Sequence, residues 1–533
     1  MAGSSPSSER ISRAHANSVE LPLLGDKMST HKQTKPVLLL IALCFLTVFA
    51  PRLLVFPISD INSDEYYSAL IAQGLLRGQM PFDYVFNGHH PAASYYFYAP
   101  FLAVFGSNII AIRSIALTYV SLSFYLIYRI CTAAGLEPRL SSVCAAIYGI
   151  ITLPFGGLAS NTELILNPLV MWVTLLCLSY SRAPSRTGAV MIGAISGICV
   201  SVNYIAAPIV GTLGLCAIIL VRRNPRAAVT DAAFAALSAL GMFFILLLPV
   251  ILFGDIIAYF SEQIAFLKLY SLGLQSPLRS DLLWQLKDWT LPILLPAVPA
   301  ATILWFTRPK SPLSGREKMI LIYLWCYVVA AVLAAVAPRR FYQHYALLVA
   351  PAITLMTGAV LYSRRGRNTL RYALVLTAAI AVAQPAFSST TRWDFERGLD
   401  GWVHWLNHQP SDSLAEVARE VKLYTHSGDY IFVTHTHDLY ILSDTRSPTR
   451  FAFGGDWWMS DPEIMRIFGT TPAEEFEKIL ALHPKMIVVG PPVRWGVRHI
   501  DPEYLRKLTA ALVSQYEYLK TIDRVELYRL KPF

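Results

Sequence analysis

Charged residues are scarce in this chain of 533 residues. They make up 15% of it, against roughly 25% in an average soluble protein. Hydrophobic residues make up 54%, and the mean hydropathy is +0.45. This composition excludes a soluble protein, so the basic pI of about 9.1 is not read as a sign of nucleic-acid binding or secretion.

Two kinds of chemical site are missing as well. Glycine-rich phosphate loops of the forms GxGxxG and GxxxxGK[ST] are absent, which leaves a nucleotide site without support. The cysteines lie inside or at the edges of apolar stretches, where cysteine behaves as a small hydrophobic residue. Neither a disulfide framework nor a zinc signature is therefore predicted. The seven are Cys44, Cys131, Cys144, Cys177, Cys199, Cys216 and Cys326.

The amino terminus lacks an apolar leader. Residues 1–34 are polar and Ser-rich and contain four basic residues. They predict a disordered cytosolic tail and not a signal peptide. Met28 is an alternative translation start, which would remove most of this tail.

Long apolar blocks, almost free of charge, dominate the rest of the chain. A helix of about 20 residues crosses a hydrocarbon core roughly 30 Å thick, so these blocks predict a polytopic α-helical membrane protein with about 11 transmembrane helices. The predicted spans are 36–57, 109–130, 139–156, 163–181, 187–203, 205–221, 230–253, 289–307, 319–337, 343–362 and 370–387. A further apolar piece, 92–106, is too short to cross alone and is expected at the membrane interface.

Basic residues set the predicted orientation. With the amino terminus inside, the short inner loops hold fifteen Lys and Arg residues, whereas the longer outer loops before residue 388 hold six. Because Lys and Arg accumulate in cytoplasmic loops, the loop 58–108 and everything after about 388 are placed on the outer face. The six outer residues are Arg77, Lys268, Arg279, Lys287, Arg339 and Arg340.

The segment 388–533 has the composition of an ordinary globular domain, in contrast to the transmembrane region 35–387. Alternating strands and helices predict a small extracytoplasmic α/β domain. The predicted strands are Tyr430–Val433, Met486–Val489 and Val525–Leu530, and the predicted helices are Ala473–Leu482 and Pro502–Tyr518.

The first outer loop is the most informative stretch. Asp60, Asp64 and Glu65 lie within six residues just after the first span, before a predicted amphipathic helix at Ser68–Leu76. Aromatic and apolar neighbours imply that Asp64 faces a packed, partly buried surface. A carboxylate is costly there unless it is paired or used, so we interpret this loop as a candidate functional site.

Several short motifs follow in order along the chain. They are Asp64-Glu65-x-Tyr67, Gly78–Pro81, His90-Pro91, Tyr95-Tyr96-x-Tyr98-Ala99-Pro100, Leu102-x-x-x-Phe105-Gly106, Asn161-Thr162-Glu163, Arg340-Phe341-Tyr342-x-His344-Tyr345 and Asp438-Leu439-Tyr440. In this arrangement the chain resembles the polytopic GT-C glycosyltransferases. Within them it is similar to the protein O-mannosyltransferase and aminoarabinose transferase branch, which takes sugar from a polyprenyl phosphate carrier. The resemblance covers about residues 36–530, and only the first-loop motifs are specific.

The resemblance implies that Asp64, the acidic residue after the first span, is catalytic. A carboxylate can take the proton of an acceptor hydroxyl as the oxygen attacks the sugar. Glu65 is the weaker candidate, because adjacent side chains on a helix point about 100° apart. Glu163, in the next short outer turn, would join Asp64 across the cleft to orient the acceptor or bind metal. The sequence requires no cofactor, and a divalent metal at these carboxylates is an open alternative.

The phosphate that leaves needs cations or hydrogen-bond donors that stabilise its growing charge. Arg339 and Arg340 lie on the outer side, against the charge bias, at the membrane boundary. At least one of them is predicted to bind the donor phosphate. Tyr342, His344 and Tyr345 are predicted as auxiliary donors.

Two further phosphate contacts are predicted. Lys268 lies on the outer amphipathic segment Asp255–Leu272, and His90 lies at the position before a proline where some relatives carry Lys. Tyr67 stands where some relatives carry Arg, and these two departures weaken an assignment to aminoarabinose transfer. His435–Asp438 is interpreted as a strand-to-helix turn with a polar cap, not as a metal site.

The sequence therefore predicts a hexosyl or pentosyl transferase of the bacterial inner membrane. It would move a single sugar from a polyprenyl phosphate carrier to a lipid, glycan or protein acceptor outside the cytoplasm, with membrane lipids but no nucleic acid as partners. The alternatives are an oligosaccharide ligase or polymerase, a lipid-linked sugar flippase or transporter, and a non-enzymatic scaffold. Neither the donor sugar nor the acceptor can be read from the sequence.

Overall fold

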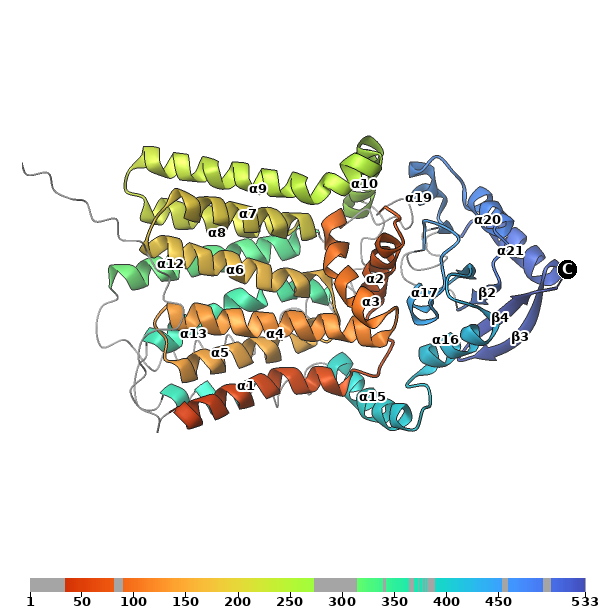
Figure 1. Cartoon of the computed structure of the whole chain (residues 1–533), viewed down its shortest axis with the longest axis horizontal. Helices are drawn as coiled ribbons and strands as arrows, with labels where there is room; N and C mark the ends of the chain where they lie inside the picture. Colours follow the sequence, from red (N-terminus) through yellow and green to blue (C-terminus); the bar gives the residue numbers. More distant parts are fainter. Residues whose placement is uncertain are drawn as a thin grey trace, which may run out of the picture.

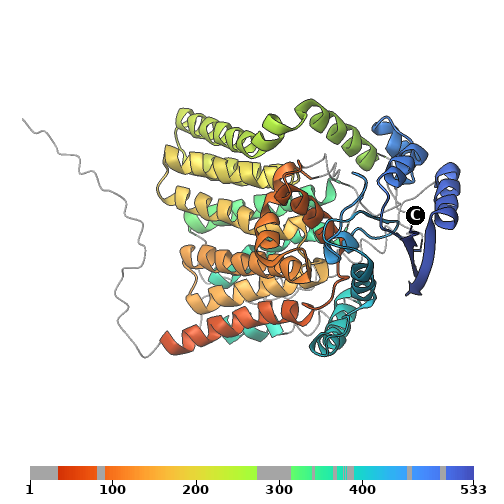
Figure 2. The same ribbon diagram turned by 45° about the vertical axis from the view of Figure 1, so that its right-hand side comes forward.

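The structure, a computed structural model, describes residues 34–80, 90–272, 314–338, 342–363, 389–452, 459–491 and 500–532 and most of 369–380. A bundle of roughly parallel and antiparallel helices forms one part of the molecule (Figure 1). A smaller domain, here called the tail domain (389–532), covers one end of the bundle (Figures 1 and 2). We call this end the tail end and the opposite end the far end. The predicted disordered segment 1–34 lies outside the described residues, apart from its last residue.

Within the described residues, seven helices are long and apolar enough to cross a membrane. The elements that form them are α1 (Thr34–Leu54), α4 (Ile109–Ala133), α5 with η2 (Pro138–Ile151 and Leu153–Phe155), α6 (Thr162–Arg182), α9 (Pro225–Phe253), α12 (Gly315–Val336) and η3 with α13 (Gln343–Leu348 and Ala350–Ser363). Two shorter apolar helices, α7 (Arg186–Val202) and α8 (Ala206–Val221), coincide with the predicted spans 187–203 and 205–221. The predicted polytopic helical fold is thereby confirmed. The span predicted at 289–307 lies outside the described residues, and that at 370–387 is described only in part.

Small residues let some helices approach closely. Gly193 and Gly197 lie four residues apart on α7, and a Cβ at either would fall within 2.3 Å of a backbone oxygen of α9. The facing residues of α9 are Ala235 and Ala239, which share the same spacing. Close packing of this kind holds helices together in lipid, where burial of apolar surface offers little advantage.

Short elements connect the bundle to the tail domain. The segment predicted at the interface, 92–106, forms η1 (Ala92–Phe97) and α3 (Ala99–Phe105), which pack against α2 (Ser63–Leu76). From the tail end of α9, α10 (Ile256–Leu272) continues toward the tail domain (Figure 1).

The tail domain contains a four-stranded sheet in the order β1-β2-β4-β3. The strands are β1 (Ile431–Val433), β2 (Met486–Val489), β3 (Tyr516–Ile522) and β4 (Val525–Leu530). β1 and β2 are parallel, and the other pairs are antiparallel. Asp523 and Arg524 form the two-residue turn between β3 and β4, both with positive φ, as a type I′ hairpin requires.

The helices of the tail domain are α15 (Ser389–Leu406), α16 (Ser413–Tyr424), α17 (Asp438–Leu442), α19 (Pro462–Ile467), α20 (Pro472–Ala481) and α21 (Pro502–Ser514). The three predicted strands are confirmed to within one residue, but the prediction missed β3. The helix predicted at Pro502–Tyr518 was too long, because Tyr516 pairs with Leu530 in the sheet. The prediction ran four residues past the end of α21 at Ser514, which is enough to hide the start of β3.

The core of the tail domain is continuous with that of the bundle. One face of the sheet packs with α20 and α21 in a separate apolar cluster. Residues of the opposite face belong to the same buried cluster as α17, α2 and the membrane helices, including Val488, Leu439 and Leu70. The tail domain is therefore packed onto α2, and α2 lies between two bodies.

Candidate active site

Helix α2 carries the first two candidate residues in its first turn. Asn62 is its N-cap, and the Asn62 side chain accepts a hydrogen bond from the backbone N–H of Asp64 at 3.0 Å. Asp64 and Glu65 follow, where the partial positive charge of the helix N-terminus favours carboxylates. Glu65 is fully buried and Asp64 is half-buried, so neighbours in sequence have different surroundings.

Glu65 is held in a buried ion pair. The guanidinium of Arg113 on α4 donates to Glu65 at 2.5 Å, and both side chains are at most 1% exposed. The backbone N–H of Ser160 donates to the other carboxylate oxygen at 2.8 Å. Burial raises the pKa of the Glu65 carboxyl, and Arg113 opposes this shift. Because all these contacts join α2 to α4 and to the turn before α6, they favour a structural role for Glu65.

Within the part of the chain that the structure describes, Asp64 has no such partner. Among the described residues, no side chain forms an ion pair or hydrogen bond with its carboxylate. Tail-domain residues His437 and Asp438 lie close enough to interact with Asp64 electrostatically. A half-buried carboxylate without a counterion is available to act on a ligand.

The N-termini of α2 and α6 are joined by their capping residues. Asn62 donates to the side chain of Asn161, the N-cap of α6, at 2.9 Å. Glu163 follows in the first turn of α6 and is 2% exposed. The structure therefore brings Asp64 and Glu163 together, as the sequence predicted, because each lies two residues beyond one member of the bridged pair.

Neutral polar groups surround Glu163. Asn203, the C-cap of α7, donates to it at 3.2 Å, and the Thr162 hydroxyl donates at 3.3 Å. The groups whose charges act on it most are His344 and Asp64. In the described part of the chain, no Lys or Arg pairs with Glu163.

The aromatic segment η3 borders the same region. His344 lies 3.7 Å from the position of a Cβ built on Gly156, in the turn that Asn161 also contacts. Its ring packs against Tyr345 at 4.7 Å and Tyr342 at 5.5 Å, and Tyr345 is buried. The predicted phosphate ligands Arg339 and Arg340 lie outside the described residues.

His90 and Lys268 both belong to the side of the site formed by α10. Gln263 on α10 donates to the backbone carbonyl of His90 at 3.0 Å, and Tyr204 donates to Gln263 at 2.6 Å. Because Asn203 binds Glu163, this chain of contacts connects His90 to the carboxylate region. Lys268 lies five residues beyond Gln263 on α10 and is exposed.

The tail domain contributes residues that sequence reasoning missed. His437 hydrogen-bonds through Nε2 to the backbone oxygen of Ser63 at 2.7 Å. Arg450 pairs with Glu262 on α10 and lies over the ring of Phe468 at 5.3 Å. The motif that contains His437 was visible, but nothing in the sequence connects it to a residue 374 positions away. The predicted strand-to-helix turn at 435–438 is present. His437 is the N-cap residue of α17, but its side chain does not cap the helix by a hydrogen bond.

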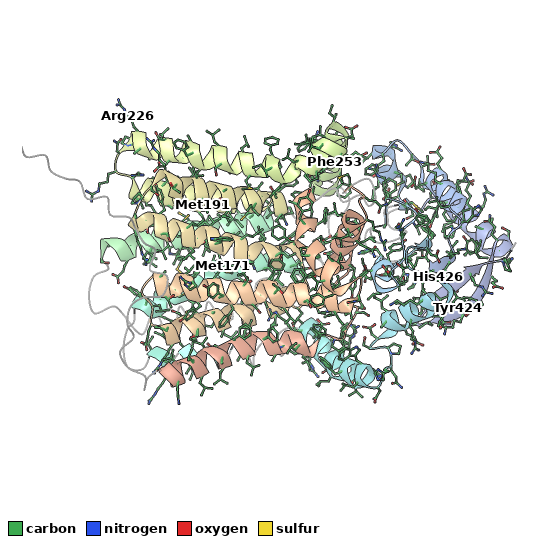
Figure 3. The ribbon with its side chains drawn as sticks, viewed as in Figure 1. Met171, Met191, Arg226, Phe253, Tyr424 and His426 are labelled. Carbon is green, nitrogen blue, oxygen red and sulfur yellow. The ribbon has the colours of Figure 1, made fainter. Side chains whose placement is uncertain are left out.

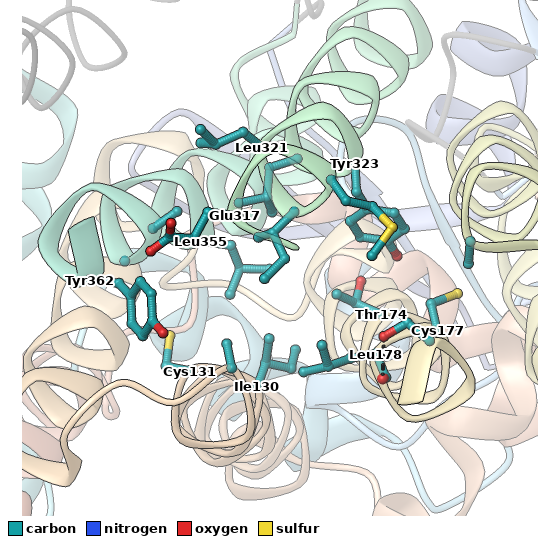
Figure 4. Close-up of a pocket in the computed structure, with 18 of the residues that line it drawn as sticks. Ile130, Cys131, Thr174, Cys177, Leu178, Glu317, Leu321, Tyr323, Leu355 and Tyr362 are labelled. Carbon is teal, nitrogen blue, oxygen red and sulfur yellow. Dashed lines mark hydrogen bonds between the residues drawn. The ribbon is translucent and has the colours of Figure 1, made fainter. Parts of the chain in front are cut away.

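Two further features bear on where a ligand could bind. No three His, Cys, Asp or Glu side chains among the described residues are grouped to hold a metal ion, so the metal alternative at Asp64 and Glu163 gains no third protein ligand there. An apolar cavity of about 300 Å³ lies at the far end, between α4, α6, α8, α12 and α13 (Figure 4). It includes none of the predicted site residues.

Comparison with solved structures identifies the fold. The crystal structure of ArnT from Cupriavidus metallidurans bound to undecaprenyl phosphate matches with a TM-score of 0.57 at 15% sequence identity, covering 94% of this chain and 100% of that one. The same protein in the apo state gives a TM-score of 0.56 at 12% identity, covering 94% and 99%. No protein-family model and no curated protein sequence matches the chain. The likeness shows that the chain shares the fold of ArnT over nearly its whole length.

Proposed function

From this shared fold we propose that the chain is a glycosyltransferase that moves a single sugar from a polyprenyl phosphate carrier to a lipid, glycan or protein acceptor. The observation that carries the proposal is Asp64. Its carboxylate lies in the first turn of α2, next to Glu163 and between bundle and tail domain, without a counterion among the described residues. The ArnT structure that holds undecaprenyl phosphate supports a carrier of this class.

In the proposed reaction an acceptor hydroxyl attacks the anomeric carbon while the bond from that carbon to the carrier phosphate breaks. Asp64 takes the hydroxyl proton as general base, and the phosphate leaves on its lipid with the bonding electrons. Glu163 orients the acceptor. Glu65, locked to Arg113, fixes the helix that presents Asp64.

Charge that develops on the phosphate requires stabilisation. We assign this to Arg340 or Arg339, with Tyr345 and His344 of η3 as further donors. His90 and Lys268 are proposed to contact the donor from the α10 side. No metal ion is required for these steps.

We place the tail domain on the outer face of the bacterial inner membrane and the amino terminus in the cytoplasm. Among the described residues, Arg129, Arg182 and Arg222 lie at or near the ends of α4, α6 and α8, and Arg226 lies at the start of α9, at the far end (Figure 3). Such residues favour the cytoplasmic side. A polyprenyl phosphate sugar would then meet Asp64 in the outer leaflet, where nucleotide sugars are absent.

The test is a transfer assay with the purified protein in detergent or liposomes. Polyprenyl phosphate sugars, supplied as a panel, should donate one sugar to an acceptor extract, seen as a mass increment of a single hexose or pentose. The Asp64→Asn protein is the matched control. Transfer from nucleotide sugars instead would reject the donor class, and an increment of a whole glycan chain would favour a ligase.

A further inference from the structure

A histidine of the tail domain contacts the first turn of α2, which carries Asp64. His437 is buried, with 1% of its surface exposed, and its Nε2 lies 2.7 Å from the backbone oxygen of Ser63. Burial lowers the pKa of this imidazole to about 4. The ring is therefore neutral at physiological pH, and its Nε2–H can donate to the carbonyl.

The carbonyl of Ser63 belongs to the peptide unit whose N–H is that of Asp64. The N–H of this peptide is held by the side chain of Asn62 at 3.0 Å, and its oxygen is held by His437. Both polar groups of one peptide plane are thus fixed by side chains from opposite bodies. Because the Cα of Asp64 ends that plane, its tilt sets the direction in which the Asp64 side chain leaves the backbone.

The imidazole is itself held against α2. Its ring meets the ring of Tyr67 edge-on, with centroids 5.1 Å apart and an interplanar angle of 66°. Tyr67 lies one turn after Ser63 on the same helix and is 1% exposed. An edge-to-face pair of this kind fixes ring orientation as well as distance, so the Nε2–H stays aimed at the carbonyl.

We propose that His437 is a positioning residue: it clamps the peptide between Ser63 and Asp64 and so aims the Asp64 carboxylate at the acceptor. The tail domain is then part of the catalytic apparatus and not only a cover over the bundle. This inference rests on the proposed function, in which Asp64 is the general base.

A second histidine of the tail domain, His435, is half-buried and supplies a control. His435 lies two residues earlier in the same turn, and burial lowers its pKa to about 4 as well. Its ring lies over Gly490 at the end of β2, where an added Cβ would overlap it. Among the described residues, no hydrogen bond or ring contact joins His435 to α2, so its loss disturbs the tail domain without removing a contact with α2.

The kinetic test compares His437→Ala, His437→Gln and His435→Ala. We expect His437→Ala to lower kcat about 10- to 100-fold with the donor KM within about twofold, since a small misplacement of a reacting group costs this much. His437→Gln should recover part of kcat, because an amide N–H can reach the same carbonyl. His435→Ala should retain the kcat of the folded enzyme. Wild-type kcat in His437→Ala, or an equal loss in His435→Ala, would overturn the proposal.

Hydrogen–deuterium exchange separates this inference from the proposed function, since it needs no substrate. In the full-length protein, amides of residues 63–67 should exchange about tenfold faster in His437→Ala than in wild type and stay unchanged in His435→Ala. Unchanged exchange in His437→Ala would reject the clamp whatever the activity. A wild-type protein that transfers no sugar from any polyprenyl phosphate donor would reject the proposed function, and the exchange result would still decide whether the clamp exists.

Discussion

Buried and half-buried carboxylates at the two ends of the bundle differ in whether they have a cationic partner. At the far end, Asp231 is bound by Arg222 at 2.7 Å and by the hydroxyl of Tyr180 at 2.5 Å. At the tail end, Glu65 has a comparable partner in Arg113, but Asp64 next to it has none among the described residues.

This difference distinguishes carboxylates that stabilise the fold from one that is available to act on a ligand. A buried carboxylate that keeps its cation contributes to the fold, and removing either partner is costly. A half-buried carboxylate without a cation among the described residues adds little to stability, and the cost of its burial is explained if it acts on a ligand. The comparison therefore supports our proposal that Asp64, at the tail end, takes part in the reaction.

The largest effect should come from labelling the two ends in intact cells with a permeabilised outer barrier. In a cysteine-free background, Cys at His426, exposed on the tail domain, should react with an impermeant thiol reagent, whereas Cys at Arg226, at the far end, should react only after lysis (Figure 3). The contrast is expected to be all or none. The opposite pattern would place Asp64 on the cytosolic side and would reject the proposed orientation.

The next effect is catalytic. Asp64→Asn should lower turnover by roughly 10² to 10⁴, because it removes a general base, with the melting temperature almost unchanged. Purified protein and steady-state transfer kinetics would measure this. Asp231→Asn is the matched control from the far end: it should lose about 1–3 kcal/mol of stability and keep the kcat of the folded enzyme. More than half of wild-type turnover in Asp64→Asn would refute the assignment.

Glu65→Gln should affect stability more than turnover, the reverse of Asp64→Asn. The change leaves the Arg113 guanidinium without a buried counterion, which is expected to destabilise the fold by about 3–5 kcal/mol. Thermal unfolding in detergent would report it. The double variant Glu65→Gln, Arg113→Met removes the stranded charge and should recover part of the loss. If Glu65→Gln melts like wild type, the pair does not anchor α2.

The smallest effect concerns pH and Asp394 of α15. Burial raises the pKa of this carboxyl to about 6, although Arg397 opposes the shift. Since the folded state holds the proton more tightly than the unfolded state, the contribution of Asp394 to stability is complete below about pH 4 and is lost as pH rises through about 6. At pH 7.5 ionisation of Asp394 lowers the free energy of unfolding by at most about 3 kcal/mol.

Asp394→Asn keeps a neutral side chain at every pH. The variant should therefore melt above wild type at pH 7.5 and together with it at pH 4, measured in the same detergent. A constant difference between the two proteins across this range would contradict the assignment of Asp394.

Much of the fold and part of the site were predictable from the sequence. The length of the apolar stretches predicted the membrane helices. Because these stretches contain few charges, Asp64 and Glu163 could be recognised as carboxylates at the ends of spans. By contrast, β3 was missed because it follows almost directly on α21, and the helical pattern was extended into it. Its pairing with β4 is a tertiary contact that the pattern within the segment does not show.

The sequence by itself determined that this protein crosses a membrane many times, carries an α/β domain near its carboxyl end and concentrates acidic residues after its first span. These properties follow from local composition and period. The tertiary structure alone decided which carboxylate is paired: Arg113 reaches Glu65 across 48 residues, and His437 reaches the backbone beside Asp64 across 374. The free energy of a buried charge depends on what lies within a few ångströms of it in space, and distance along the chain carries no information about that.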